Sequence, residues 1–320
     1  MASASFKSGP SKRQRLRVLV CDPIKEVGIE RLRGAGFKVD VRPKITSEEL
    51  KAVIQNYDAL IVRSRTKVTS TLIERAERLK VIGRAGVGLD NIDVEAAEKR
   101  GIAVLNTPEA PADSTAELTI GLILALARGI PSAVDSMKKG KWLKGRLKGW
   151  QLKGKTIGLI GLGNVGLRVA RLAKAFGMKV LFTKRTPPSP DVLQELEAEF
   201  VSLEDLLRRS DIVSLHVPLT DETRGMVGTR ELGLMKRGAI LVNTSRGAIV
   251  DEEALLEALR SGRLGGAALD VYTVEPPRDM RLIQLSNVVC TPHIGAQTEE
   301  AQVEASKLIA EKIIQYLLQP

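Results

Sequence analysis

The chain has 320 residues, a formal net charge of +11 and a hydrophobic content of 43%, but only 3% of its residues are aromatic. This length allows two domains with separate cores. The few aromatic side chains cannot supply stacking platforms for single-stranded nucleic acid, the basic residues are spread along the chain, and no zinc-ligand spacing is present. We therefore expect no nucleic-acid partner and no metal site.

The beginning of the chain, its longest apolar run and its cysteines bear on cellular location. Residues 1–15 contain four basic side chains and no apolar core, which predicts a flexible basic tail rather than a secretory signal. The run from Leu118 to Ala127 is too short to span a bilayer, so we expect no membrane partner. Cys21 and Cys290 lie in apolar runs, which is typical of buried free thiols in a reducing compartment. A cytoplasmic location follows.

Apolar, β-branched runs alternate with amphipathic helical patterns after the tail. The first series of predicted strands is Leu16–Cys21, Lys38–Val41, Ala59–Val62, Val81–Arg84 and Val104–Leu105. A Pro-rich break at residues 106–111 then precedes a long predicted helix, Ser114–Arg128. The second series of predicted strands is Thr156–Ile160, Lys179–Phe182, Ile212–Leu215, Ala239–Val242, Ala267–Asp270 and Val288–Cys290. Predicted helices between the strands include Ser47–Gln55, Val165–Phe176 and Asp251–Ser261.

This alternation predicts an α/β protein with two doubly wound, parallel-sheet domains of the Rossmann type. The last pattern, Glu299–Leu318, is helical and has no strand after it. We expect it to return to the first domain. The predicted layout is therefore one domain formed by residues 16–107 and 296–320, with a second domain, residues 108–295, inserted into it.

A glycine-rich motif, Gly161-Leu-Gly-Asn-Val-Gly166, follows the predicted strand Thr156–Ile160 and opens a helix. In this context Gly161 allows a tight turn, Gly163 lets the backbone approach a pyrophosphate, and Gly166 lets helix and strand pack closely. The alternative is a glycine-rich turn without a ligand. The motif predicts that residues 108–295 bind a dinucleotide, with Asn164 and Val165 also in the cradle.

The end of the next strand bears on the choice of cofactor. An acidic residue normally stands about 20 positions after the glycines and bonds the ribose 2′-hydroxyl. Here the sequence is Thr183-Lys184-Arg185, without a carboxylate. Lys184 and Arg185 could hold a 2′-phosphate, which favours NADP(H) over NAD(H); alternatively, both side chains are simply solvated.

Three segments near the C-terminus contain one Arg, one Glu and one His, each after an apolar run: Arg246, Glu275 and His293. A guanidinium binds a carboxylate through two parallel hydrogen bonds, so Arg246 is a candidate for the substrate carboxylate. A His with a Glu partner can move a proton near neutral pH, so His293 and Glu275 form a candidate acid–base pair. Together they indicate a redox enzyme for a small anionic 2-hydroxy or 2-keto acid.

These segments resemble the signatures of the D-isomer-specific 2-hydroxyacid dehydrogenases. They read Asn243-Thr-Ser-Arg-Gly-Ala-Ile-Val-Asp251, Ala268-Leu-Asp-Val-Tyr272 with Glu275-Pro276, and Thr291-Pro-His-Ile-Gly-Ala296, and the resemblance covers nearly the whole chain after the tail. It implies that residues 108–295 bind NAD(P) and the remainder binds substrate, and that Asp270 orients the nicotinamide amide or ribose. The further expected cofactor-binding residues are Val217, Pro218, Thr223, Thr244, Ser245, His293, Gly295 and Ala296.

The first domain resembles the branch of this family that acts on 3-phosphoglycerate. The similar segments are Ile61-Val-Arg-Ser-Arg-Thr-Lys-Val-Thr69 and Arg84-Ala-Gly-Val-Gly-Leu-Asp-Asn-Ile-Asp93. The resemblance implies an anion site for the substrate, although Arg63 and Lys67 could also belong to an ordinary solvated loop. The expected substrate-binding residues are Arg63, Ser64, Lys67, Arg84, Gly86, Val87 and Asn106.

The expected activity is therefore the interconversion of 3-phosphoglycerate and 3-phosphohydroxypyruvate, the entry step of serine synthesis. That branch usually carries an Asp and uses NAD where this chain has Lys184 and Arg185, whereas NADPH-dependent glyoxylate and hydroxypyruvate reductases of the family carry basic residues there. Such a reductase is one alternative, and a dinucleotide-sensing corepressor is another. The resemblance also implies a homodimer formed through the nucleotide domain, and a short form without a C-terminal regulatory domain.

Overall fold

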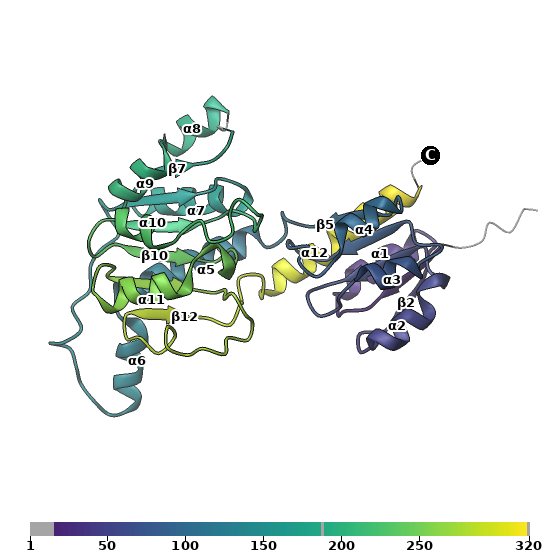
Figure 1. The fold of residues 1–320 in the computed structure, drawn as a ribbon, viewed down its shortest axis with the longest axis horizontal. Coiled ribbons are helices and arrows are strands. Elements are labelled where there is room, and N and C mark those ends of the chain that lie inside the picture. The colour runs from purple at the N-terminus through teal and green to yellow at the C-terminus, as the bar shows by residue number, and fades with distance from the viewer. Residues whose placement is uncertain (1–15, 187–188, 319–320) are drawn as a thin grey trace, which may run out of the picture. The chain divides into compact units, whose positions relative to one another are not determined.

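The computed structural model describes residues 16–186 and 189–318, so the predicted tail at residues 1–15 lies outside the described residues. The chain divides into two compact units (Figure 1). Unit 1 contains residues up to Thr107 together with those from Gln302 onward, and unit 2 spans Pro108–Ala301. The expected insertion of one domain into the other is confirmed. The chain returns to unit 1 at residue 302, within the last helix, a few residues beyond the predicted position.

Unit 1 is built on a five-stranded parallel sheet with the order β2-β1-β3-β4-β5. Its strands are β1 (Arg17–Val20), β2 (Lys38–Val41), β3 (Ala59–Val62), β4 (Val81–Arg84) and β5 (Ala103–Asn106). Its helices are α1 (Glu26–Gly34), α2 (Ser47–Val53), the 3₁₀ turn η1 (Ile54–Asn56), α3 (Ser70–Glu74), α4 (Val94–Lys99) and most of α12 (Glu299–Leu318). The strand order reverses between β1 and β3, and such switch points favour ligand binding at the carboxyl ends of the strands.

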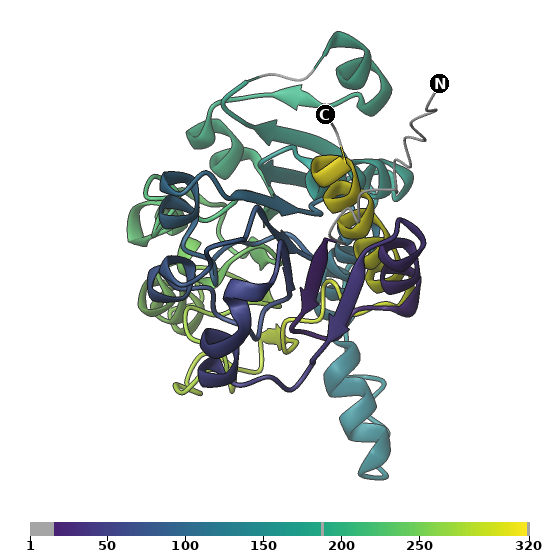
Figure 2. The same ribbon diagram turned by 90° about the vertical axis from the view of Figure 1, so that its right-hand side faces the viewer.

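Helices cover both faces of this sheet because side chains alternate along its strands. Val18 and Val20 of β1 pack with Leu32 of α1 and Ile309 of α12 on one face. Leu19 and Cys21 pack on the other face with the apolar side chains of α2, α3 and α4. Figures 1 and 2 show α12 lying alongside α1, and the backbone N–H of Lys25 donates to Oγ of Ser306 at 2.9 Å. The C-terminal helix therefore completes the core of unit 1.

Unit 2 is built on a seven-stranded parallel sheet with the order β12-β11-β10-β9-β6-β7-β8. Its strands are β6 (Thr156–Ile160), β7 (Lys179–Thr183), β8 (Glu199–Phe200), β9 (Ile212–Leu215), β10 (Ile240–Asn243), β11 (Gly266–Leu269) and β12 (Val288–Cys290). Its helices are α5 (Ala112–Ala127), α6 (Ile130–Lys138), α7 (Asn164–Ala175), α8 (Pro190–Leu196), α9 (Leu203–Arg209), α10 (Thr229–Leu234), the 3₁₀ turn η2 (Gly247–Ile249) and α11 (Glu252–Arg260). The order is that of dinucleotide-binding sheets, with its switch point between β6 and β9.

The two predicted series of strands are confirmed, each within one residue of its expected bounds, but β8 was not predicted. β8 has only two residues, and both of them are exposed at the sheet edge. Its sequence therefore lacks the apolar run that marked the other strands.

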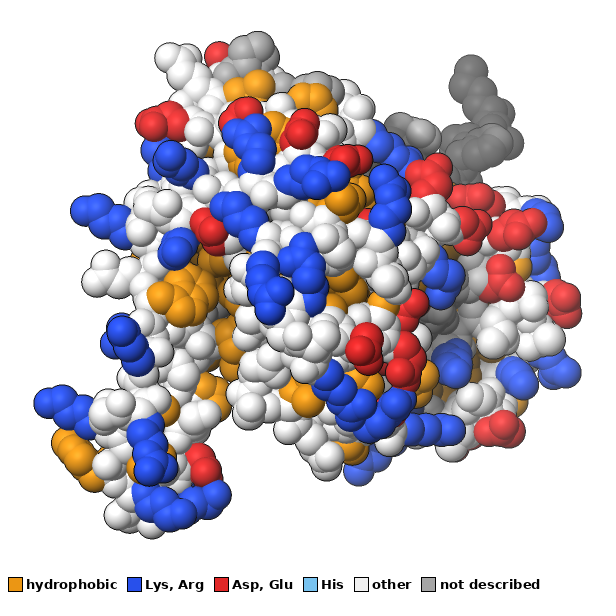
Figure 3. All heavy atoms as spheres, turned by 60° about the vertical axis from the view of Figure 1, so that its left-hand side comes forward, with side chains coloured by type: hydrophobic (Ala, Val, Ile, Leu, Met, Phe, Trp, Pro, Cys, Tyr) orange, Lys and Arg blue, Asp and Glu red, His pale blue; other side chains and the backbone are white. Residues whose placement is uncertain are grey.

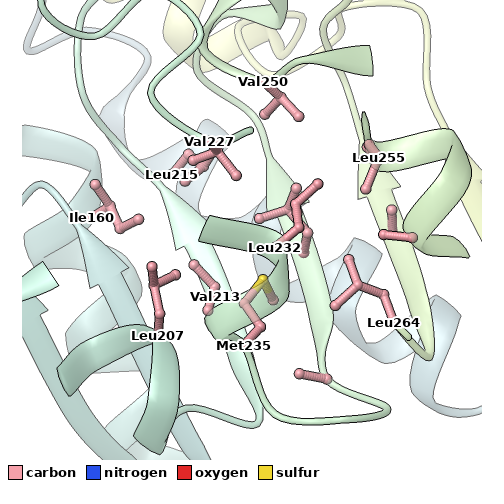
Figure 4. Packing of buried hydrophobic residues seen from close by; sticks show 14 of the residues in the cluster. Ile160, Leu207, Val213, Leu215, Val227, Leu232, Met235, Val250, Leu255 and Leu264 are labelled. Carbon is pink, nitrogen blue, oxygen red and sulfur yellow. The ribbon is translucent and has the colours of Figure 1, made fainter. Parts of the chain in front are cut away.

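Two apolar layers enclose the sheet of unit 2. On one face, α5 and α7 pack on Ile157, Leu159 and Phe182. On the other face, Leu207, Leu232 and Leu255, from three separate helices, pack on strand residues such as Val213 (Figure 4). Both faces are buried, as expected for a parallel sheet whose strands have continuous apolar sequences.

Among the described residues, no single helix is long and apolar enough to cross a membrane. The pair α5 and α6, bent by 65°, meets the criterion by length and composition only. Lys and Arg side chains lie at many separate places on the face shown in Figure 3, with Asp and Glu among them.

Candidate functional site

The glycine-rich motif forms a tight turn between β6 and α7. Gly161 has φ +98°, and a Cβ there would lie 2.4 Å from the carbonyl oxygen of His216. A Cβ at Gly166 would lie 2.4 Å from the carbonyl oxygen of Gly161. Gly163 caps α7 without a side-chain hydrogen bond, and nothing lies within 4 Å of the place where its Cβ would be. In the described chain no side chain caps the first amides of α7, which fits the binding of a dinucleotide pyrophosphate there.

The turn after β7 places two cations beside this loop, because the backbone N–H of Gly161 donates to the carbonyl of Thr183 at 2.9 Å. Arg185 forms an ion pair with Glu222, and both side chains are largely exposed. The structure describes no ion pair for Lys184 within residues 16–186 and 189–318. The turn therefore offers one cation that is already paired and one that is not.

The segment after β9 borders the same loop. Thr223 donates its hydroxyl to the carbonyl of Pro218 at 2.6 Å and accepts from the backbone N–H of Thr220 at 2.8 Å, so it closes this segment on itself. His216 lies 2.9 Å through Nε2 from Oγ of Ser214. Burial lowers the pKa of His216 to about 4, so the ring is neutral near pH 7. This His supports the loop and is not a proton carrier at neutral pH.

Asn243, the last residue of β10, shapes the turn that contains Arg246. Its Oδ1 accepts from the backbone N–H of Ser245 at 3.1 Å, and its Nδ2 donates to the carbonyl of Arg246 at 2.8 Å. Thr244 lies beside Thr119 of α5, with 2.9 Å between the two hydroxyl oxygens. Asn243 was not predicted as a site residue, although it is a polar residue directly at the end of an apolar strand. It fixes the backbone on either side of the arginine.

The two side chains predicted to form an acid–base pair are in contact. Nδ1 of His293 donates to Oε2 of Glu275 at 2.7 Å, and Oε1 of Glu275 accepts from the backbone N–H of Tyr272 at 3.2 Å. Both side chains are partly exposed, at 46% for His293 and 38% for Glu275. Because Glu275 occupies Nδ1, Nε2 is the ring nitrogen that can exchange a proton with a substrate.

Asp270 anchors the segment that contains His293. Its carboxylate, only 1% exposed, accepts from the hydroxyl of Thr291 at 2.6 Å and from the backbone N–H groups of Ile294 and Gly295 at 2.8 and 2.9 Å. The resemblance implied that this carboxylate orients the nicotinamide amide or ribose, and that role stays a prediction. In the described chain both oxygens accept from the segment that contains His293, whose backbone has φ +53°.

The candidate catalytic residues follow three neighbouring strands. Arg246 comes after β10, Glu275 after β11 and His293 after β12, and these strands are adjacent in the sheet. Gly247 fixes how closely the first two segments approach, because a Cβ there would lie 1.9 Å from the carbonyl carbon of Tyr272. The carboxyl ends of parallel strands lie at one edge, so a guanidinium, a carboxylate and an imidazole follow strands that end at the same edge of unit 2.

In unit 1, the predicted substrate-binding residues follow three adjacent strands: Arg63, Ser64 and Lys67 follow β3, Arg84 ends β4, and Asn106 ends β5. Nδ2 of Asn106 donates to the carbonyl of Val87 at 2.7 Å. Gly86 has φ +146°, and the guanidinium of Arg84 folds back over it into the space that a Cβ would fill. Nη1 of Arg84 donates to the carbonyl of Ala85 at 2.7 Å. The segment 84–87 is thus a compact loop with an arginine over its glycine.

A separate hollow of about 570 Å³ lies at the opposite, amino-terminal edge of the unit 2 sheet, beside Thr156 and Lys179. Its cations Lys174, Arg209 and Lys236 form ion pairs with Glu197, Glu199 and Asp211. None of the predicted site residues lines it. Within the described ranges, no group of three or more His, Cys, Asp and Glu side chains could hold a metal ion.

Comparisons with known proteins agree with this geometry. Residues 120–295 match the family model of the D-isomer specific 2-hydroxyacid dehydrogenase NAD binding domain. The D-3-phosphoglycerate dehydrogenase of Methanocaldococcus jannaschii is 50% identical over 299 residues, which are 93% of this chain and 57% of that protein. The hydroxypyruvate reductase of Thermotoga maritima is 48% identical over 306 residues, which are 95% of this chain and 99% of that protein. A glyoxylate reductase crystal structure from Paecilomyes thermophila has a TM-score of 0.88 at 31% identity, with 96% of each chain covered. The chain thus spans little more than half of the first relative and nearly all of the second.

Proposed function

Because the chain belongs to the D-isomer specific 2-hydroxyacid dehydrogenase family, we propose that it is an oxidoreductase that transfers a hydride between a nicotinamide cofactor and a D-2-hydroxy acid. The proposed substrate pair is 3-phosphoglycerate and 3-phosphohydroxypyruvate, which would place the protein at the entry to serine synthesis. The observation that carries the proposal is the His293–Glu275 contact of 2.7 Å, at the same sheet edge as Arg246. The name of the Methanocaldococcus relative supports the choice of substrate.

The residues of unit 2 have separable roles in the proposed mechanism. Bound nicotinamide supplies the hydride acceptor for oxidation and the hydride donor for reduction. Nε2 of His293 takes the proton of the C2 hydroxyl during oxidation and returns it during reduction, and Glu275 holds the ring in place through Nδ1. Arg246 binds the substrate carboxylate and polarises the C2 oxygen. Asp270 maintains the backbone on which His293 stands.

Unit 2 is the proposed dinucleotide-binding domain. The open N-terminus of α7 would receive the pyrophosphate, and Thr183, Lys184 and Arg185 would lie along the adenosine ribose. The lysine and the absence of an acidic residue in this turn favour NADP(H) over the NAD(H) that is usual in the phosphoglycerate branch. Unit 1 would supply the anion site for the substrate phosphate through Arg63, Lys67 and Arg84.

A second candidate is a hydroxypyruvate or glyoxylate reductase. One observation favours it: the hydroxypyruvate reductase of Thermotoga maritima matches this chain over 99% of its own length. The basic turn after β7 also fits an NADPH-dependent reductase. The phosphate of 3-phosphohydroxypyruvate separates the two candidates, since hydroxypyruvate and glyoxylate lack it.

We also propose a cytoplasmic homodimer that forms through unit 2. Ile130, Val134 and Met137 recur along one face of α6 and are 46%, 46% and 58% exposed, and Trp142 beyond the helix is 77% exposed. Figure 1 shows α6 standing out from the rest of unit 2. An apolar stripe on an exposed helix is typical of an interface. Cys21 and Cys290, both without a disulfide in the described chain, support a reducing compartment.

The direct test is a panel of substrates assayed with both cofactors. Purified protein should reduce 3-phosphohydroxypyruvate with a higher kcat/KM than hydroxypyruvate or glyoxylate, and NADPH should support a higher rate than NADH. Faster turnover of glyoxylate or hydroxypyruvate would favour the reductase. Cofactor binding without turnover of any 2-keto acid would contradict enzymatic function.

A further inference from the structure

We infer that Asp22 and Asn91 are positioning residues that fix the backbone of the loop 63–67, so that Arg63 and Lys67 face a ligand while Arg65 serves the fold. Neither residue belongs to the groups expected to touch substrate or cofactor. The inference deepens the proposed function, since it rests on this loop being the site for the substrate phosphate.

Asp22 follows β1, at the point where the strand order of unit 1 reverses, and its carboxylate is 1% exposed. Oδ2 accepts from the backbone N–H groups of Arg63 and Thr66 at 2.6 and 3.2 Å. Oδ1 accepts from Nε of Arg65 at 2.9 Å and from the hydroxyl of Thr66 at 2.8 Å. One buried carboxylate therefore holds three residues of the loop. Charge-assisted bonds of this kind are stronger than those between neutral groups.

Asn91 binds backbone carbonyl groups of the same loop. Nδ2 of Asn91 donates to the carbonyl of Arg63 at 2.8 Å and to the carbonyl of Thr66 at 2.6 Å. The backbone N–H of Val68 donates in turn to the carbonyl of Asn91 at 2.8 Å. Asp22 thus binds amides of Arg63 and Thr66 while Asn91 binds carbonyls of the same two residues, so each of these residues is fixed at both ends.

The same contacts divide the three cations of the loop. Arg65 is committed to the protein: besides Asp22, it donates to the carbonyls of Cys21 and Ile45 at 2.5 and 3.2 Å. The guanidinium of Arg63 makes one long described contact, 3.4 Å from Nη1 to the carbonyl of Pro23. Lys67 has no ion pair among the residues that the structure describes. The side chains of Arg63 and Lys67 can therefore bind an anion without first breaking an ion pair. Because the loop backbone is already fixed, anion binding does not have to order it.

The test compares variants that release the loop with one that removes an equivalent carboxylate elsewhere. Asp22→Asn replaces an acceptor of N–H groups with an amide, and Asn91→Ala removes the donor to both carbonyls. Asp58→Asn is the matched control: Asp58 is 3% exposed in the same unit and accepts from the backbone N–H of Arg17 at 2.9 Å and from Arg78 at 3.2 Å, at the opposite end of β3. Thr66→Val and Thr66→Ser are a second, milder comparison. Thr66→Val removes the hydroxyl that donates to Asp22, and Thr66→Ser keeps it.

Two readouts are taken: KM and kcat for 3-phosphohydroxypyruvate and for hydroxypyruvate, and hydrogen exchange of the amides of residues 63–67. Asp22→Asn and Asn91→Ala should raise KM for the phosphorylated substrate by about 10-fold or more, as expected when a charge-assisted contact is lost. They should leave KM for hydroxypyruvate within about twofold and speed exchange of the Arg63 and Thr66 amides. Thr66→Val should show a smaller effect in the same direction, and Thr66→Ser and Asp58→Asn should not.

Unchanged exchange, an equal rise in KM on both substrates, or the same result from Asp58→Asn would overturn the inference. If Asp22→Asn does not fold, Asn91→Ala and Thr66→Val test the inference by the same criteria. If the unmodified protein shows no preference for the phosphorylated substrate, the proposed function fails. The exchange data still judge the role of Asp22 and Asn91 separately, with faster exchange supporting it and unchanged exchange rejecting it.

Discussion

The turn after β7 leads to a prediction about cofactor choice that can be worked out contact by contact. Lys184 has no ion pair among the described residues, whereas Arg185 is paired with Glu222. If Lys184 bonds the 2′-phosphate of NADPH, the contact is charge-assisted and contributes about 1.5–3 kcal/mol. Lys184→Ala should then weaken NADPH binding by roughly 10–150-fold and change NADH binding little. Lys184→Asp should go further and favour NADH, because a carboxylate repels the phosphate and can bond the ribose diol.

Glu222 provides the opposite perturbation. Its pair with Arg185 is exposed on both sides, at 70% and 75%, and such pairs contribute about 0.2–1 kcal/mol. Glu222→Gln frees Arg185 at that small cost and removes a negative charge near the phosphate. We expect NADPH binding to tighten by no more than about fivefold, with NADH binding unchanged.

The assay is equilibrium binding of NADPH and NADH to each purified variant, at a single ionic strength because these contacts are screened by salt. Lys179→Ala is the control, since Lys179 is an exposed lysine at the other end of the same strand. A tenfold or greater preference of the unmodified protein for NADH would refute the reasoning. So would an equal loss of both cofactors in Lys184→Ala.

Three further predictions follow from the site. His293→Gln should lower kcat by about 10²–10⁴-fold with cofactor affinity near normal, because a general acid–base is lost; unchanged turnover would remove His293 from the mechanism. Arg63→Ala should lower kcat/KM on 3-phosphohydroxypyruvate by roughly 10–150-fold and affect glyoxylate little, while an equal loss on both substrates in parallel kinetics would make Arg63 structural. The pKa of His216 is lowered to about 4 by burial, so its neutral state contributes stability that is present above about pH 6.5 and is lost as the pH falls toward 4. Between pH 7 and 5, urea denaturation should show the unmodified protein losing up to about 2 kcal/mol more than His216→Gln, and identical pH dependence would contradict this assignment.

The sequence predicted the parts of the molecule that depend on local patterns. The parallel strands were visible as apolar runs alternating with helical patterns, whereas the order of the strands in each sheet was not predicted. Arg246, Glu275 and His293 were identifiable because each lies in a short segment that follows a predicted buried strand. The contact of His293 with Glu275 confirms that these two groups meet.

Hydrogen bonds between distant segments were beyond sequence reasoning. Asp22 bonds residues more than 40 positions away, and nothing in its own neighbourhood indicates which amides it will meet. The bonds of Asp270 to the backbone N–H groups of Ile294 and Gly295 were not predicted, since they depend on how the chain turns at His293. The pairing of Arg185 with Glu222 likewise joins two loops whose proximity is set by the sheet and not by the sequence around either residue.

The left-handed backbone at His293 limits how this position can evolve. With φ +53°, the residue occupies a region that asparagine and glycine enter readily and that valine, isoleucine and threonine avoid. Replacement of this histidine by asparagine or glycine is therefore compatible with a folded protein, even where the imidazole is lost. A β-branched replacement would in addition destabilise the fold, by about 1–2 kcal/mol or more. In a library randomised at codon 293, soluble but inactive clones should be rich in the first group and poor in the second.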